Sequence, residues 1–189
     1  QAIYFDSRCT PAYLKYADIY KSANAGLAIE KLNQLKTLEP SNTAIDKKLA
    51  EIYYLKNDFS KAADAYSRFA MGPTANEEDL VKYAFALFLN HDFAKSLEVA
   101  NMGLKKNPRH AAFNRLAMYN NTDLKRFEEA LKAADVFFNE CDKADYSYLD
   151  YMYYGHLLEE LKKYDEAVGQ YEKAVELDPT KTDLYKNIS

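Results

Sequence analysis

The amino-acid sequence predicts an all-α protein made of about five antiparallel helical hairpins. The sequence repeats itself about every 34 residues, and within each repeat apolar side chains recur three and four residues apart. Only 5 Gly and 5 Pro occur in 189 residues. Ala, Leu, Lys, Glu and Tyr dominate instead, which favours long helices joined by short turns and argues against an all-β fold.

The repeat is clearest at the turns within the hairpins. Three turns end in phenylalanine at intervals of 34 residues: Phe59, Phe93 and Phe127. A small side chain follows each of them three residues later: Ala62, Ser96 and Ala130. A further copy, at Tyr164 and Ala167, comes 37 residues after the preceding one, and a three-residue insertion between Cys141 and Ser147 accounts for the difference. An earlier copy is visible through its second half, around Ala28 and Pro40.

Each period has room for two helices. In the period that begins at Thr43, the apolar spacing predicts a first helix over Thr43–Lys56 and a second from Phe59 or Ser60 to Met71. Asn57 and Asp58 form the turn between them. Three residues are candidate N-caps of the first helix: Ser41, Asn42 and Thr43.

These residues resemble the tetratricopeptide repeat, whose pattern is an aromatic residue, Leu-Gly, Tyr, Ala, an aromatic residue and a final Pro. The copy at residues 148–181 fits best, with Tyr in place of the family's Trp at the first aromatic position. Its matching residues are Tyr151, Tyr154, Gly155, Leu158, Ala167, Tyr171, Ala174 and Pro179. The resemblance implies that the hairpins stack into a right-handed α-α superhelix, a solenoid, with the first helix of each hairpin on the concave side.

The resemblance covers nearly the whole chain and divides it into repeats. The expected segments are 1–8 (N-terminal segment), 9–42 (repeat 1, degenerate), 43–76 (repeat 2), 77–110 (repeat 3), 111–147 (repeat 4, degenerate, with the insertion), 148–181 (repeat 5) and 182–189 (a capping helix or the start of a sixth repeat). To fit the pattern, repeat 1 needs a turn one residue shorter than usual. Repeat 4 needs one additional residue between Asn120 and Arg126, so that Ala117 is the small residue of its first helix and Ala130 that of its second. Phe137 is bulky where the pattern has a small residue, so irregular packing is expected there. A chain that begins with Gln and runs into a sixth period is expected to be a piece of a longer protein or to have lost a leader.

Small side chains are expected along the seam of each hairpin. Ala50, Ala84 and Gly155 lie on the inner face of the first helices, and Ala62 and Ala167 face them from the second helices. Small residues allow the two helices to approach closely, and neighbouring tyrosines then fill the grooves between ridges. Most of the aromatic residues are therefore expected in the core.

The family's partner-facing positions lie on the first helices. Transferred to this sequence, they give the candidate partner-binding residues Lys47, Glu51, Val81, Lys82, Phe85, Phe88, Arg115, Met118, Met152, Tyr153 and His156. The apolar members form a strip suited to a hydrophobic peptide or a partner helix. The alternative for Phe85 and Phe88 is that they pack against the next hairpin.

One subclass of the family grips a peptide's terminal carboxylate with lysine and asparagine side chains. Lys47 and Arg115 fit that clamp, but Glu51 and Lys82 replace its asparagines, so the clamp is predicted to be broken. Two alternatives remain for the basic residues. Either Lys47, Lys82 and Arg115 form a weaker anion site, or they are simply solvated.

Composition and motifs exclude several other functions. The net charge is −4 with interspersed Lys and Glu, which predicts no nucleic-acid partner, and no apolar run approaches the length of a membrane span. The scattered histidines His91, His110 and His156 belong to no metal or catalytic motif, so we predict no enzyme activity, metal or cofactor. Cys9 and Cys141 fit no disulfide framework. The expected function is a scaffold that binds a protein or peptide of unknown identity in the concave groove; the alternatives are a self-associating spacer in a larger complex, or regulatory repeats attached to an enzyme elsewhere.

Overall fold

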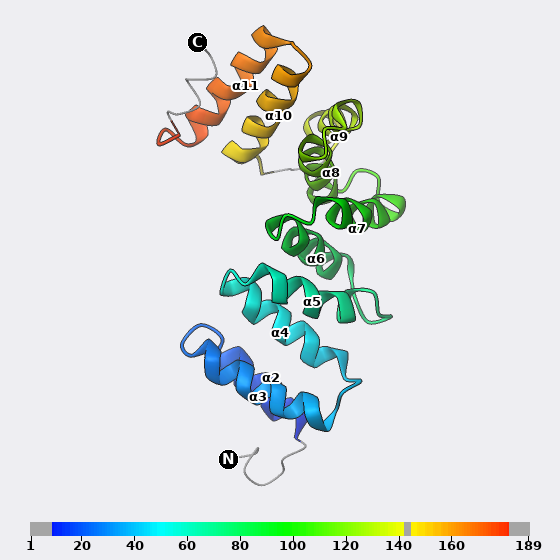
Figure 1. The fold of residues 1–189 in the computed structure, drawn as a ribbon, viewed down its shortest axis with the longest axis vertical. Coiled ribbons are helices and arrows are strands. Elements are labelled where there is room, and N and C mark those ends of the chain that lie inside the picture. The colour runs from blue at the N-terminus through cyan, green and yellow to red at the C-terminus, as the bar shows by residue number, and fades with distance from the viewer. Residues whose placement is uncertain (1–8, 142–144, 182–189) are drawn as a thin grey trace. The chain divides into compact units, whose positions relative to one another are not determined.

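The computed structural model describes residues 9–141 and 145–181, and these residues form ten α-helices and no strand (Figure 1). The helices are α2 (Thr10–Tyr20), α3 (Ala25–Leu38), α4 (Thr43–Leu55), α5 (Phe59–Ala70), α6 (Glu77–Leu89), α7 (Phe93–Lys106), α8 (Ala111–Asp123), α9 (Phe127–Asn139), α10 (Tyr148–Glu160) and α11 (Tyr164–Leu177). The predicted all-α class is confirmed. The expectations for residues 1–8 and 182–189, and for the centre of the insertion, lie outside the described residues.

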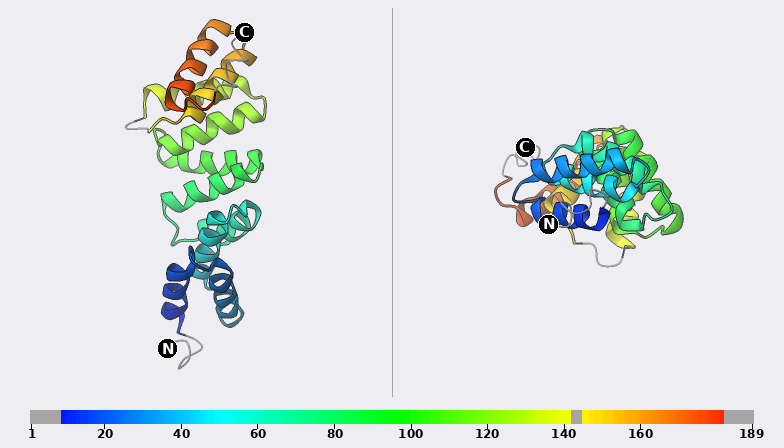
Figure 2. Two further views of the ribbon diagram at one scale, coloured as in Figure 1. Left: turned by 90° about the vertical axis from the view of Figure 1, so that its left-hand side faces the viewer. Right: turned by 90° about the horizontal axis from the view of Figure 1, so that it is seen from below.

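The chain divides into two compact units, residues 1–91 and 92–189. In unit 1, α2 packs on α3, α4 on α5, and α5 on α6; in unit 2, α7 packs on α8, α8 on α9, and α10 on α11. Figure 2 shows the paired helices of each unit from two further directions. No helix within residues 9–141 and 145–181 combines the length and the apolar character that crossing a bilayer requires.

Three-residue links join most of the paired helices. The middle residue of the link has a left-handed backbone, with φ of 58° at Asn57, 58° at Lys125 and 60° at Lys162. This conformation ends the first helix and turns the chain back. In the first of these links, the Asp58 N–H donates to the Tyr53 carbonyl at 2.9 Å, and the Asp58 side chain then caps α5 by accepting from the Lys61 N–H at 3.3 Å. The turn and the next helix start are therefore encoded by adjacent residues.

The fourth hairpin differs from the sequence prediction at its turn. Helix α9 begins 16 residues after α8 begins, as α5 does after α4, so the extra residue expected between Asn120 and Arg126 is absent. The residue at the small position of α8 is consequently Met118, whose exposed fraction is 0%, and not Ala117. Helix α9 compensates for the large Met118 with a small residue, because Ala134 occupies the position that Tyr171 holds in the last hairpin.

The small seam residues let paired helices approach. A Cβ placed on Gly155 would lie 2.7 Å from the ring of Tyr171, so the first helix of this hairpin touches the tyrosine through its backbone. Ala50 and Ala62 are both completely buried in the hairpin of α4 and α5. The cores of these two hairpins thus depend on residues that have almost no side chain.

The substitution Ala62→Leu tests this seam. Three additional carbon atoms have no room beside a fully buried alanine, so we expect the free energy of unfolding to fall by about 1–3 kcal/mol. Urea denaturation followed by circular dichroism measures the change. Ala94→Leu, at an exposed position of α7, is the matched control, and equal unfolding curves for the two variants would show that the seam is assigned to the wrong residues.

Candidate functional site

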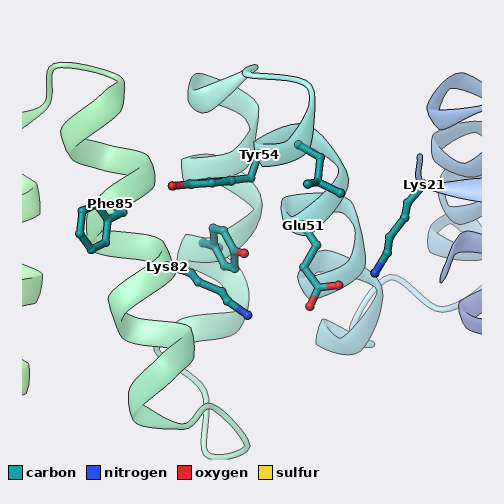
Figure 3. A pocket seen from close by; sticks show the side chains of 7 residues that line it. Lys21, Glu51, Tyr54, Lys82 and Phe85 are labelled. Atoms are coloured by element: carbon teal, nitrogen blue, oxygen red, sulfur yellow. The ribbon is translucent and has the colours of Figure 1, made fainter. Parts of the chain in front are cut away.

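Unit 1 contains a cavity of about 450 Å³ on the side formed by its first helices (Figure 3). Helices α4 and α6, the end of α2 and one residue of α5 line it: Lys21, Glu51, Tyr54, Leu55, Tyr66, Lys82 and Phe85. The sequence predicted Glu51, Lys82 and Phe85 as partner-binding residues, and the structure brings these three together. Lys21, Leu55 and Tyr66 were not predicted. Leu55 directly follows Tyr54 in the last turn of α4. The repeat pattern could have indicated Leu55 as a lining residue from this position.

Apolar side chains make up one wall and the floor of this cavity. Tyr54 and Phe85 are half-buried, Leu55 is 57% exposed, and Tyr66 is almost completely buried beneath them. The Tyr54 ring packs edge-on against Phe59, with 5.5 Å between ring centroids, which fixes its orientation. Burial raises the pKa of Tyr54, so its hydroxyl stays protonated and can donate a hydrogen bond. The wall is therefore apolar with one polar tip.

The charged side chains at the cavity are paired within unit 1. Lys48 donates to Glu51 at 3.3 Å and to Asp18 at 2.8 Å. Lys82 lies 2.7 Å from Glu78 one turn earlier, and this hydrogen bond raises the pKa of Lys82. Figure 3 shows Lys21 extending toward Glu51 from the end of α2. The cavity thus presents balanced charge around an apolar centre.

Lys47 has a structural partner outside the cavity. Its Nζ lies 2.7 Å from Oδ1 of Asp79, which is 1% exposed, and 4.9 Å from the centre of the Phe69 ring. The other carboxylate oxygen of Asp79 accepts from the Asn76 N–H at 3.1 Å, in the capping box that begins α6. Lys47 therefore ties α4 to the start of α6.

Arg115 makes the corresponding tie in unit 2. It donates to both carboxylate oxygens of the completely buried Asp150, at 2.7 and 3.0 Å. Asp150 also accepts from the Tyr119 hydroxyl at 2.6 Å and from the Ser147 N–H at 2.7 Å, in the capping box of α10. Because Lys47, Lys82 and Arg115 each lie 2.7 Å from a carboxylate, the weaker anion site has no uncompensated cation on which to rest.

The apolar strip predicted for the first helices of unit 2 requires a correction. Met118 is completely buried and does not reach the surface of the structure, because the true register of α8 places it on the seam. The next residue, Tyr119, is also buried, and its ring stacks on that of Tyr153 with 4.1 Å between ring centroids. The Tyr153 hydroxyl donates to Asp123 at 3.0 Å. Burial, reinforced by the nearby carboxylates, raises the pKa of both tyrosines.

The remaining predicted residues lie at or near the surface of their own units. In unit 1, Val81 and Phe88 are half-buried on α6. In unit 2, Met152 is half-buried, and the exposed His156 lies 4.0 Å from both Glu159 and Glu160. Within the described part of the chain, no group of three or more His, Cys, Asp or Glu side chains could hold a metal ion.

The family model for the tetratricopeptide repeat matches residues 148–181. No curated protein sequence matches the chain. Among solved structures, YrrB, described as a tetratricopeptide-repeat protein with an unusual peptide-binding site, is similar with a TM-score of 0.75 at 15% identity, over 94% of this chain and 91% of that chain.

Two further structures show the same fold. MamA is similar with a TM-score of 0.72 at 17% identity, over 94% of this chain and 96% of its own. A tetratricopeptide-repeat protein from Parabacteroides merdae ATCC 43184 gives a TM-score of 0.75 at 19% identity, over 94% of this chain and 70% of its own. Residues 148–181 thus form a tetratricopeptide repeat, and the chain as a whole has the fold of tetratricopeptide-repeat proteins.

Proposed function

We propose that this chain is a non-catalytic protein-interaction scaffold that binds a peptide segment of a partner in the unit 1 cavity. The observation that carries the proposal is the cavity of about 450 Å³ with Tyr54, Leu55 and Phe85 around it. Exposed apolar side chains around a concave site are typical of ligand-binding surfaces. The likeness to YrrB, which is described as having a peptide-binding site, supports the same function.

The chemistry of the cavity defines what the peptide must carry. One aliphatic or aromatic side chain enters between Tyr54 and Phe85, where its burial contributes about 1.5–3 kcal/mol. The Glu51 carboxylate can accept from a backbone N–H of the peptide, and the Tyr54 hydroxyl can donate to a backbone carbonyl. Because the surrounding charges are paired, we expect binding to depend weakly on salt.

Phe85→Ala tests this function. Peptides are first selected from a random library on the whole chain, and their dissociation constants are then measured by isothermal titration calorimetry. Loss of the phenylalanine removes one apolar wall, so we expect binding to weaken about tenfold or more. Tyr164→Ala, which removes a 60% exposed aromatic side chain from α11, should leave binding unchanged. Equal dissociation constants for Phe85→Ala and the unmodified chain would refute the assignment.

Self-association is the second candidate function. The last hairpin exposes large apolar side chains, with Tyr164 at 60%, Leu177 at 52% and Leu149 at 37%. Such residues favour burial against another surface. Light scattering over a range of protein concentrations distinguishes the two functions, since a monomer at every concentration would contradict self-association and leave peptide binding in unit 1 unaffected.

A further inference from the structure

Helix α8 lacks the large side chains that fill the same positions in the last hairpin. In α10 these positions hold Tyr151, Tyr154 and Leu158, and 37 residues earlier they hold Asn114, Ala117 and Asn121. Two amides and a methyl group therefore replace three bulky residues. They lie three and four residues apart, so they share one face of α8.

This face forms the floor of a groove within unit 2. The groove has a volume of about 380 Å³, and α7 and α9 supply its two walls. Leu97 and Leu104 lie on the α7 wall, and Val136 lies on the α9 wall. The missing bulk of α8 provides a direct physical reason for the hollow.

The two floor amides have bonding capacity left over. Asn114 is 4% exposed, and its Nδ2 donates to the carbonyls of Pro108 at 2.9 Å and His110 at 3.2 Å, which leaves Oδ1 as an acceptor. Asn121 is 6% exposed and lines the groove, and its side-chain amide forms no hydrogen bond with any residue in 9–141 or 145–181. The side-chain amide of Asn121 is open to the solvent in the groove. Both floor residues therefore present hydrogen-bonding groups to a ligand that enters the groove.

The spacing of the amides matches an extended polypeptide. Seven residues of α-helix place Asn114 and Asn121 about 10.5 Å apart along the axis of α8. Three residues of an extended chain cover about 10 Å, and a side-chain amide donates and accepts as a backbone peptide group does. Ala117 between them allows a chain to lie close to the helix. Because α8 and α9 run antiparallel, Val136 lies toward the Asn114 end of the groove.

We propose that this groove binds an extended peptide segment of a partner protein, separately from the unit 1 cavity. The peptide's backbone groups pair with Asn114 and Asn121, and its aliphatic side chains contact Leu97, Leu104 and Val136. This site is independent of the proposed function of unit 1, because none of its residues lines that cavity.

The test uses the capped peptide acetyl-Leu-Ser-Leu-Ser-Leu-amide as probe and the whole ¹⁵N-labelled chain. Nuclear magnetic resonance titration should shift the side-chain NH₂ signals of Asn114 and Asn121 until they saturate. Asn121→Leu restores the leucine that α10 has at this position. We expect this variant to have a higher melting temperature. We also expect it to bind the probe at least about tenfold more weakly, since it loses the amide that pairs with the peptide backbone.

Two controls separate the alternatives. Asn33→Leu, the same substitution at an exposed position of α3, should change neither probe binding nor its saturation. Phe85→Ala should also leave probe binding unchanged, so failure of the unit 1 assignment and failure of this one are distinguishable. Shifts that do not saturate at the solubility limit of the probe, unchanged binding by Asn121→Leu, or a lower melting temperature of that variant would each overturn the proposal.

Discussion

Asp150→Ala is expected to lower the free energy of unfolding by about 3–5 kcal/mol, the largest effect of any single substitution considered for this chain. The carboxylate is completely buried, and it accepts hydrogen bonds from Arg115, Tyr119 and Ser147. Its removal takes away the carboxylate partner of the Arg115 guanidinium and the carboxylate that accepts from the Tyr119 hydroxyl. It also removes half of the capping box at the start of α10.

Urea denaturation followed by circular dichroism measures this loss. Asp150→Asn keeps the shape and one acceptor oxygen but lacks the charge, so its effect should lie between those of alanine and the unmodified chain. The matched control is Glu172→Ala, an exposed position of α11, which should change stability by less than about 0.5 kcal/mol. If Asp150→Ala and Glu172→Ala destabilise equally, the buried network does not contribute as described.

Gly103→Ala is expected to destabilise the protein by about 1–3 kcal/mol, although alanine is the better helix former. An added Cβ would lie 2.1 Å from Cε2 of Phe113, which is far inside van der Waals contact. Phe113 is completely buried, so its ring can move only by displacing the groups that cover it. Helices α7 and α8 would have to separate to accept one methyl group.

Gly169→Ala provides a control of opposite sign. No heavy atom lies within 4 Å of an added Cβ at this position of α11. Alanine there should raise the free energy of unfolding by about 0.5–1 kcal/mol, because it lowers the entropy of the unfolded chain. Thermal denaturation of both variants provides the comparison. Melting temperatures that rise together would show that α7 and α8 do not approach as closely as the structure has them.

The sequence predicted the helices well because their signals are local. The predicted helix Thr43–Lys56 ends one residue later than α4 does, and the predicted end at Met71 is also one residue late. Asn42 was among the candidate N-caps, and its side chain accepts from the Ala44 N–H at 3.1 Å. Apolar spacing, caps and turn residues act within a few positions of one another, so a single sequence contains them.

The site was harder to predict because it depends on ion pairs between side chains of different helices. Lys47 and Arg115 were assigned to partner binding from their repeat position alone. Their carboxylate partners, Asp79 and Asp150, lie 32 and 35 residues further on and carry an ordinary capping signal, which gives no indication of an ion pair. Met118 was misplaced for a different reason. Its assignment followed the expectation of a small residue at position 117, whereas the constant length of the hairpins places Met118 on the buried seam.

In the hairpin of α8 and α9, the large seam residue lies on the first helix and the small one on the second, the reverse of the last hairpin. This reversal limits how the helices of this chain could be recombined. In the last hairpin a glycine at residue 155 faces the ring of Tyr171, whereas in the hairpin of α8 and α9 the large residue is Met118 and the small one is Ala134. A chimera that joined α8 to α11 would bring two large side chains to one place, and one that joined α10 to α9 would leave a void. The whole hairpin, and not the single helix, is therefore the smallest module that engineers could move within this array.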